Sequence, residues 1–146
     1  MGKKPRYKQG IFVPQYPQKY RGKLDTIVYR SGLELKFFKH FDTRANVIEW
    51  ASEEFAIPYT APDGTRHRYF VDVWAKVKTR SGEIREYICE IKPFSQTIAP
   101  APPKRLSEAY RRRMAEYLIN QCKWDAAEKF AAKNNLRFVK LTEKDI

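Results

Sequence analysis

Cysteine is scarce in this chain, and long hydrophobic runs are missing. Its 146 residues include only two cysteines, Cys89 and Cys122, and neither lies in a metal-binding cluster such as C-x-x-C. We therefore expect reduced thiols in a cytoplasmic setting. No apolar run approaches the roughly 18 to 20 residues of a membrane span, and no signal-peptide core follows the basic amino terminus. The sequence thus predicts a cytoplasmic protein without a membrane segment.

Several common catalytic motifs are also missing. The chain has no phosphate-binding P-loop, no glycine-rich dinucleotide fingerprint and no serine or cysteine nucleophile motif. Its two histidines, His40 and His67, are isolated from each other in the sequence. A zinc site or a histidine-based nucleophile is therefore disfavoured.

Positive charge is the property that the chain has in excess. Lys and Arg number 29 against 17 Asp and Glu, which gives a formal net charge of +12. Such an excess favours a polyanionic partner, because binding releases the counterions of the polyanion. Nucleic acid is the leading candidate, and a soluble basic protein without such a partner is the alternative. The hydrophobic fraction of 42% is sufficient for one packed domain.

The order of the expected elements indicates an α/β sandwich. Residues 1–25 are rich in Lys, Arg, Tyr and Gln, and Pro14 and Pro17 interrupt any helix, so we expect a loose, extended basic arm before a domain at residues 26–146. Apolar periodicity predicts helices at 31–43 and 107–133, and strands at 47–50, 55–59, 68–78, 86–92 and 136–141. This order favours a central mixed β-sheet flanked by helices.

The strands at 68–78 and 86–92 are expected to form a β-hairpin. Arg80, Ser81 and Gly82 suit a three-residue turn with Gly82 in the left-handed conformation. If Ser81 is the centre of this turn, Asp72 and Glu90 lie opposite each other, with β-carbons about 4.5–5.5 Å apart. Lys92 projects from the same face.

Two facing acids repel each other, so a cation between them is expected. Carboxylate oxygens suit Mg²⁺ or Mn²⁺, which also bind phosphate oxygens. Asp72 and Glu90 are thus candidate metal ligands, and Lys92 is a candidate catalytic cation that orients the attacking water. The alternative is a solvated strand face on which Lys92 bridges the acids. Glu34 follows Ser31 at capping-box spacing, and spacing alone favours a structural cap.

Three runs in the sequence carry a family resemblance. Residues 29–34 (YRSGLE), 68–72 (RYFVD) and 89–93 (CEIKP) resemble the catalytic domain of the TnsA transposon endonuclease and the bacteriophage head-completion proteins. The match to the phage proteins includes residues 8–10 and 17–20 of the arm. One departure is Val71, where many relatives have proline before the metal-binding aspartate.

The resemblance implies a restriction-endonuclease-like fold and a Mg²⁺-dependent DNA endonuclease of the PD-(D/E)xK type. Glu34 would then join Asp72, Glu90 and Lys92 as catalytic residues, and it would contribute to the metal site with the two other acids. This raises the catalytic interpretation of Glu34 above the cap interpretation. The phage resemblance further implies processing of packaged DNA at head completion, in the host cytoplasm, with head or neck proteins as partners.

Basic residues near these motifs are candidates for DNA contacts. They lie before Asp72 or around the start of the second helix: Arg66, Arg68, Lys104, Arg105, Arg111, Arg112 and Arg113. A solvated helix face is the alternative for the arginine triplet.

Two rival functions remain open. One is a non-enzymatic DNA-binding assembly protein that keeps the nuclease fold, although the four intact site residues argue against it. The other is a junction-resolvase-like nuclease.

Overall fold

A mixed four-stranded sheet lies at the centre of the protein. The computed structural model describes residues 9–146. The strand order is β3 (Val47–Ser52), β6 (Val73–Lys78), β7 (Ile84–Ile91) and β8 (Arg137–Leu141). The pairs β3–β6 and β6–β7 are antiparallel, and β7–β8 is parallel. The predicted mixed sheet is therefore confirmed.

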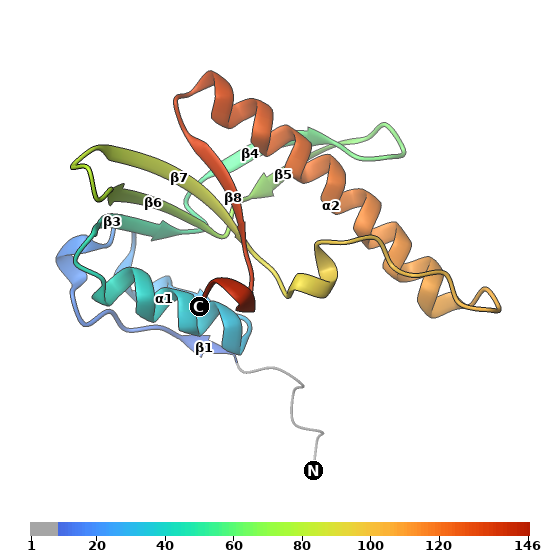
Figure 1. Ribbon diagram of the computed structural model, residues 1–146, viewed down its shortest axis with the longest axis horizontal. Coiled ribbons are helices and arrows are strands. Elements are labelled where there is room, and N and C mark those ends of the chain that lie inside the picture. The colour runs from blue at the N-terminus through green and yellow to red at the C-terminus, as the bar shows by residue number, and fades with distance from the viewer. Residues whose placement is uncertain (1–8) are drawn as a thin grey trace, which may run out of the picture.

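The two helices cover opposite faces of this sheet (Figure 1). On one face, α1 (Gly32–Thr43) buries Phe37, Phe38 and Phe41 in a core cluster that includes Cys89 of β7. On the other face, α2 (Glu108–Lys133) buries Trp124 in a second cluster. Ile88, the neighbour of Cys89 in β7, belongs to this second cluster, as strand alternation requires. The expected sandwich is confirmed.

Helix α2 has its predicted bounds but a different buried stripe. The Ser107 hydroxyl caps its start, and Asn135 adopts a left-handed φ of 56° just after its end. Apolar residues at four-residue spacing, among them Met114, Leu118 and Cys122, predict a buried stripe that includes Leu118, yet Leu118 is 47% exposed. Strict four-residue spacing drifts around a helix by about 40° per step, so the stripe buried in the core follows Trp124, Ala127 and Ala131 instead. Within residues 9–146, no helix has the length and apolarity to cross a membrane.

The β6–β7 hairpin forms in the predicted register. Its pairs run from Val73 opposite Cys89 to Lys78 opposite Ile84. Gly82 in the turn has a φ of 91°, in the left-handed region that glycine favours. The paired ladder ends at Val73, so Asp72 lies one residue beyond it.

The single strand predicted at 68–78 is instead two strands, β5 (Arg66–Phe70) and β6. β5 pairs with β4 (Ala56–Thr60) as a ribbon that diverges from the sheet. The interruption behaves as a β-bulge, because residues 53–55 lie opposite only residues 71–72. Apolar alternation continues across this bend, which is why the sequence did not reveal it.

The described part of the predicted arm, residues 9–25, is packed against the domain. Strand β1 (Gly10–Ile11) pairs with β2 (Val28–Tyr29). Phe12 and Tyr20 are buried in the α1-side cluster, and both rings contact Trp50 edge-on. A loose arm is therefore wrong for these residues, because burial of aromatic side chains offsets their irregular backbone. Residues 1–8 of the predicted arm lie outside the described residues.

Candidate active site

Four predicted site residues converge at one end of the sheet. Glu34 is in the first turn of α1, Asp72 is at the bulge, Glu90 is near the end of β7 and Lys92 follows that strand. Lys92 Nζ lies 3.8 Å from Glu90 Oε1. The charges of Glu90 and Glu34 raise the pKa of Asp72, and the charge of Lys92 lowers it. The structure thus brings together residues from three separate segments of the chain.

Burial raises the pKa of all three acids above its ordinary value. Burial raises the pKa of Asp72 well above its ordinary range, and the neighbouring Glu90 charge adds to the effect. Burial also raises the pKa of Glu90, while the Tyr69 hydrogen bond and Lys92 oppose the increase. For Glu34, burial again raises the pKa, and the Arg30 N–H opposes it. A bound cation would favour the ionised form of all three acids.

Each of the three carboxylates is held by one protein donor. The Ile91 backbone N–H donates to Asp72 Oδ2 at 2.7 Å. The Arg30 backbone N–H donates to Glu34 Oε2, and the Tyr69 hydroxyl donates to Glu90 Oε2. Hydrogen bonds of this kind fix the orientation of acids around a metal and leave the second oxygen of each acid for other partners.

The donor set suits a hard cation with an incomplete protein shell. Within residues 9–146, no three Asp, Glu, His or Cys side chains lie close enough to enclose a metal by themselves. Mg²⁺ does not require such a cage, because it typically takes one or two carboxylates and completes its octahedron with water and phosphate oxygens. Asp72 and Glu90 fit this pattern, with Glu34 as a third acid nearby.

The capping interaction at the start of α1 involves Glu34 only in part. The Ser31 hydroxyl accepts the Glu34 backbone N–H at 3.0 Å, so Ser31 is a true N-cap. The Glu34 carboxylate, however, accepts from the Arg30 N–H and not from Ser31, which a reciprocal capping box would require. Glu34 is also buried. Its carboxylate therefore contacts the segment just before the cap and lies in the electrostatic field of the site.

Sequence reasoning assigned no role to Tyr69. In one uninterrupted strand, Tyr69 and Val73 would share a face, yet Tyr69 packs in the α2-side cluster and Val73 in the α1-side cluster. The bulge between them reverses the alternation, and this reversal brings the Tyr69 hydroxyl to Glu90. Periodicity alone could not reveal this contact.

Two cations near the site were also missed. The Arg30 guanidinium forms an ion pair with Glu53 and lies close enough to Glu34 and Asp72 for their charges to raise its pKa further. Lys123 Nζ of α2 lies 5.7 Å from the centroid of the Tyr69 ring, and its charge helps to lower the pKa of Glu90. Arg30 lies in the 29–34 run of the family resemblance, which was the available signal for it.

The predicted DNA-contact residues are exposed but do not form one surface patch. Arg66 and Arg68 project from β5, and the Arg68 guanidinium lies 5.2 Å from the Phe70 ring centroid. The others lie in the connection before α2 or in its first turns: Lys104, Arg105, Arg111, Arg112 and Arg113. Consecutive helical residues point about 100° apart, so the arginine triplet does not share one face. Of these three residues, only Arg113 lines the cavity between α2 and residues 95–101.

The mixed sheet, its two flanking helices and the acidic cluster at one sheet end define a protein of restriction-endonuclease-like fold. Residues 44–143 match the model of the TnsA-like endonuclease N-terminal family, and the chain belongs to this family. It is also 38% identical over 139 residues to the head completion nuclease of Enterobacteria phage T4. This alignment covers 92% of this chain and 90% of that relative. The family resemblance is thus confirmed, and the matched range includes Asp72, Glu90 and Lys92.

Proposed function

We propose that this protein is a metal-dependent DNA endonuclease of the PD-(D/E)xK type that acts in phage head completion, by processing DNA ends after packaging. The observation that carries the proposal is the convergence of Glu34, Asp72, Glu90 and Lys92 at one sheet end. Membership of a nuclease family supports the reaction class. The similarity to a head completion nuclease supports the biological setting and the expectation of head or neck proteins as partners.

Each site residue has a distinct role in the proposed reaction. Asp72 and Glu90 would hold Mg²⁺ or Mn²⁺, and Glu34 would contribute to the same site. The ion, when bound, lowers the pKa of water and neutralises charge on the scissile phosphate. Lys92 orients the attacking water and donates to the phosphate oxygens as negative charge develops on them. Tyr69 and the Ile91 N–H keep Glu90 and Asp72 in position.

The test is cleavage of supercoiled, linear and branched DNA with Mg²⁺, with Mn²⁺ and with EDTA. We expect phosphodiester hydrolysis with either metal and none with EDTA. Binding of DNA without cleavage under all conditions would instead support the non-enzymatic assembly protein. Strong selectivity for branched DNA would support a junction-resolvase-like nuclease.

DNA binding should weaken steeply with salt and show little sequence preference, because the chain has no motif for reading base edges. Replacing Arg111, Arg112 and Arg113 together by Ala should reduce the slope of log K against log salt by about 0.9–1.8. This corresponds to about one or two lost phosphate contacts, because the three side chains point in different directions. Fluorescence anisotropy with labelled duplex across a salt series measures the slope.

The matched control replaces three exposed basic residues away from α2 and the site: Lys39, Lys78 and Arg80. It removes the same net charge, so it controls for the long-range field of the protein. If the α2 variant and this control bind DNA alike at every salt concentration, the proposed phosphate contacts on α2 are wrong.

A further inference from the structure

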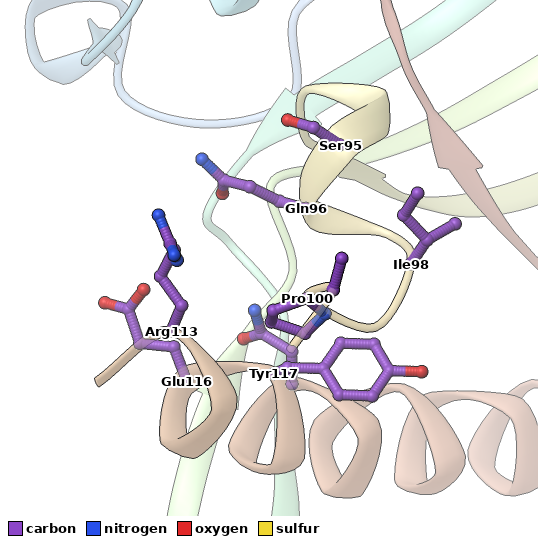
Figure 2. A pocket seen from close by; sticks show the side chains of 9 residues that line it. Ser95, Gln96, Ile98, Pro100, Arg113, Glu116 and Tyr117 are labelled. Carbon is purple, nitrogen blue, oxygen red and sulfur yellow. The ribbon is translucent and has the colours of Figure 1, made fainter. Parts of the chain in front are cut away.

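A cavity of about 450 Å³ lies between α2 and residues 95–101. Figure 2 shows that its lining divides into two ends. Gln96, Arg113 and Glu116 gather at one end, where they present both hydrogen-bond donors and acceptors. Ile98 and Tyr117 lie at the other, which is apolar and aromatic. Cavities of this size commonly hold small ligands or single groups of a larger one.

Ordered parts of the fold form both walls of the cavity. On one wall, the Phe94 backbone N–H donates to Glu143 Oε2 at 2.9 Å, and the Thr97 hydroxyl donates to the Phe94 carbonyl at 2.7 Å. On the other wall, Tyr117 and Asn120 lie on the α2 stripe that continues to the buried Trp124. These contacts hold residues 94–97 and the α2 wall in place.

Both walls of the cavity continue along the chain to residues at or near the candidate active site. Its loop wall begins just after Lys92, where the chain leaves β7 and runs toward α2 (Figure 1). Its helical wall includes Asn120, which lies one turn before Lys123 on α2. The Lys123 charge acts on the pKa of Glu90. A DNA strand whose phosphate lies at the proposed metal site would therefore have its neighbouring nucleotide close to the cavity entrance.

We propose that this cavity binds one unpaired nucleotide of the DNA substrate, next to the scissile phosphate, an inference that rests on the proposed nuclease function. Ile98 is 51% exposed and lies with Tyr117 at the apolar end, which suits the face of a base. The Glu116 carboxylate would repel a bare phosphate, whereas with Gln96 and Arg113 it complements the mixed donors and acceptors of a base edge.

The occupant must be unpaired for a physical reason. A base within a duplex is stacked on both faces, and its pairing edge is already hydrogen-bonded. Only a base outside the stack can place a face on an aromatic side chain and its edge against protein amides. Such a nucleotide comes either from a single-stranded end or from an unpaired position inside a duplex, and the test below distinguishes these sources.

The test compares three labelled DNAs in EDTA by fluorescence anisotropy: a fully paired duplex, a duplex with a single-stranded extension and a duplex with one internal unpaired nucleotide. Tyr117→Ala should weaken binding of the extended duplex by about 5- to 150-fold, which corresponds to the ~1–3 kcal/mol of base–aromatic stacking. Binding of the fully paired duplex should change by less than about 2-fold. Tyr117→Phe should retain the parental preference, since it keeps the ring.

Leu118→Ala is the matched control, because Leu118 neighbours Tyr117 on α2 but is exposed and outside the cavity lining. A loss confined to the extended duplex identifies a strand end as the source of the nucleotide. Losses with both unpaired DNAs identify any unpaired nucleotide. Equal losses for all three DNAs, or a Tyr117→Ala effect no larger than that of Leu118→Ala, would overturn the cavity proposal.

This design separates the cavity proposal from the proposed function. If the parental protein cleaves no DNA with Mg²⁺, the nuclease function fails. The inference that the cavity binds a nucleotide next to a scissile phosphate then fails as well. If the parent cleaves DNA but Tyr117→Ala shows no selective loss, only the cavity proposal fails. Thermal melting by circular dichroism checks that each variant is folded, so that a loss of binding reports on the cavity alone.

Discussion

Asp72→Asn should lower Mg²⁺-dependent cleavage by about 10³-fold or more, while the protein stays folded. Metal-ion stabilisation of a transition state is worth several kcal/mol, and each 1.4 kcal/mol corresponds to about a tenfold change in rate. The asparagine oxygen can still accept the Ile91 N–H that holds Asp72 in place. The substitution therefore removes the charge and leaves the supporting hydrogen bond. Single-turnover plasmid cleavage measures the effect.

The same variant should be more stable than the parent in EDTA at neutral pH, by about 0.2–1 kcal/mol, as for relief of like-charge repulsion between facing strand residues. The folded-state pKa of Asp72 is raised above its unfolded value, so the folded protein binds more protons between the two values. The parental free energy of unfolding should therefore fall as pH rises above about 4. In Asp72→Asn this decrease should be shallower, because Glu90 and Glu34 are the remaining site acids with a raised pKa.

Denaturant unfolding between acid and neutral pH, with and without Mg²⁺, tests this dependence. Mg²⁺ should stabilise the parent at neutral pH, since it binds the ionised acids of the folded state, and should stabilise the variant less. Asp125→Asn, at an exposed acid of α2 that pairs with Lys129, is the control and should behave as the parent. Parental cleavage by Asp72→Asn would show that Asp72 is not a metal ligand.

Glu34→Gln should fold normally and lose about 10²-fold or more of the Mg²⁺-dependent activity. The glutamine side-chain oxygen can still accept the Arg30 N–H, so the start of α1 should stay intact. The substitution removes the negative charge of one of the three acids at the site. A neutral amide does not replace this charge in binding a cation. Cleavage rates and thermal melting should thus separate, with a large change in rate and a small change in melting temperature.

Ser31→Ala is the matched control for Glu34→Gln, because Ser31 provides the actual cap of α1. Its loss should cost about 0.5–2 kcal/mol of stability and leave the activity of the folded protein near the parental value. The two variants therefore have opposite expected effects. Near-parental cleavage by Glu34→Gln would return Glu34 to a structural role and leave a site of Asp72, Glu90 and Lys92.

Predictions that rested on local signals were the successful ones. The helix starts at Ser31 and Ser107, the Gly82 turn and the hairpin register all depend on residues close together in sequence, and all are confirmed. The register alone placed Asp72 next to the β7 segment that carries Glu90 and Lys92. Only the family resemblance added Glu34, because its position near the other acids depends on the packing of α1 against a sheet formed later in the chain.

The failures have a common physical origin in packing between distant segments. The described arm was expected to be loose, since its prolines prevent helix formation, but Phe12 and Tyr20 are buried beside Trp50. The strand at 68–78 was expected to be continuous, but an extra residue in the opposing segment 53–55 bends it. Local sequence indicates the preferred backbone conformation of a segment. It does not indicate which distant side chains will pack against that segment and bury it.

The sequence by itself therefore determined the element types, the hairpin register and the chemical class of the candidate site. Those properties follow from periodicity, turn residues and the identities of acids and lysine along the chain. Tertiary structure alone decided the face on which Tyr69 lies, the approach of Arg30 and Lys123 to the acids, and the raised pKa values of the acids. These depend on the bulge, on helix packing and on burial, which arise only when separate segments meet and exclude water.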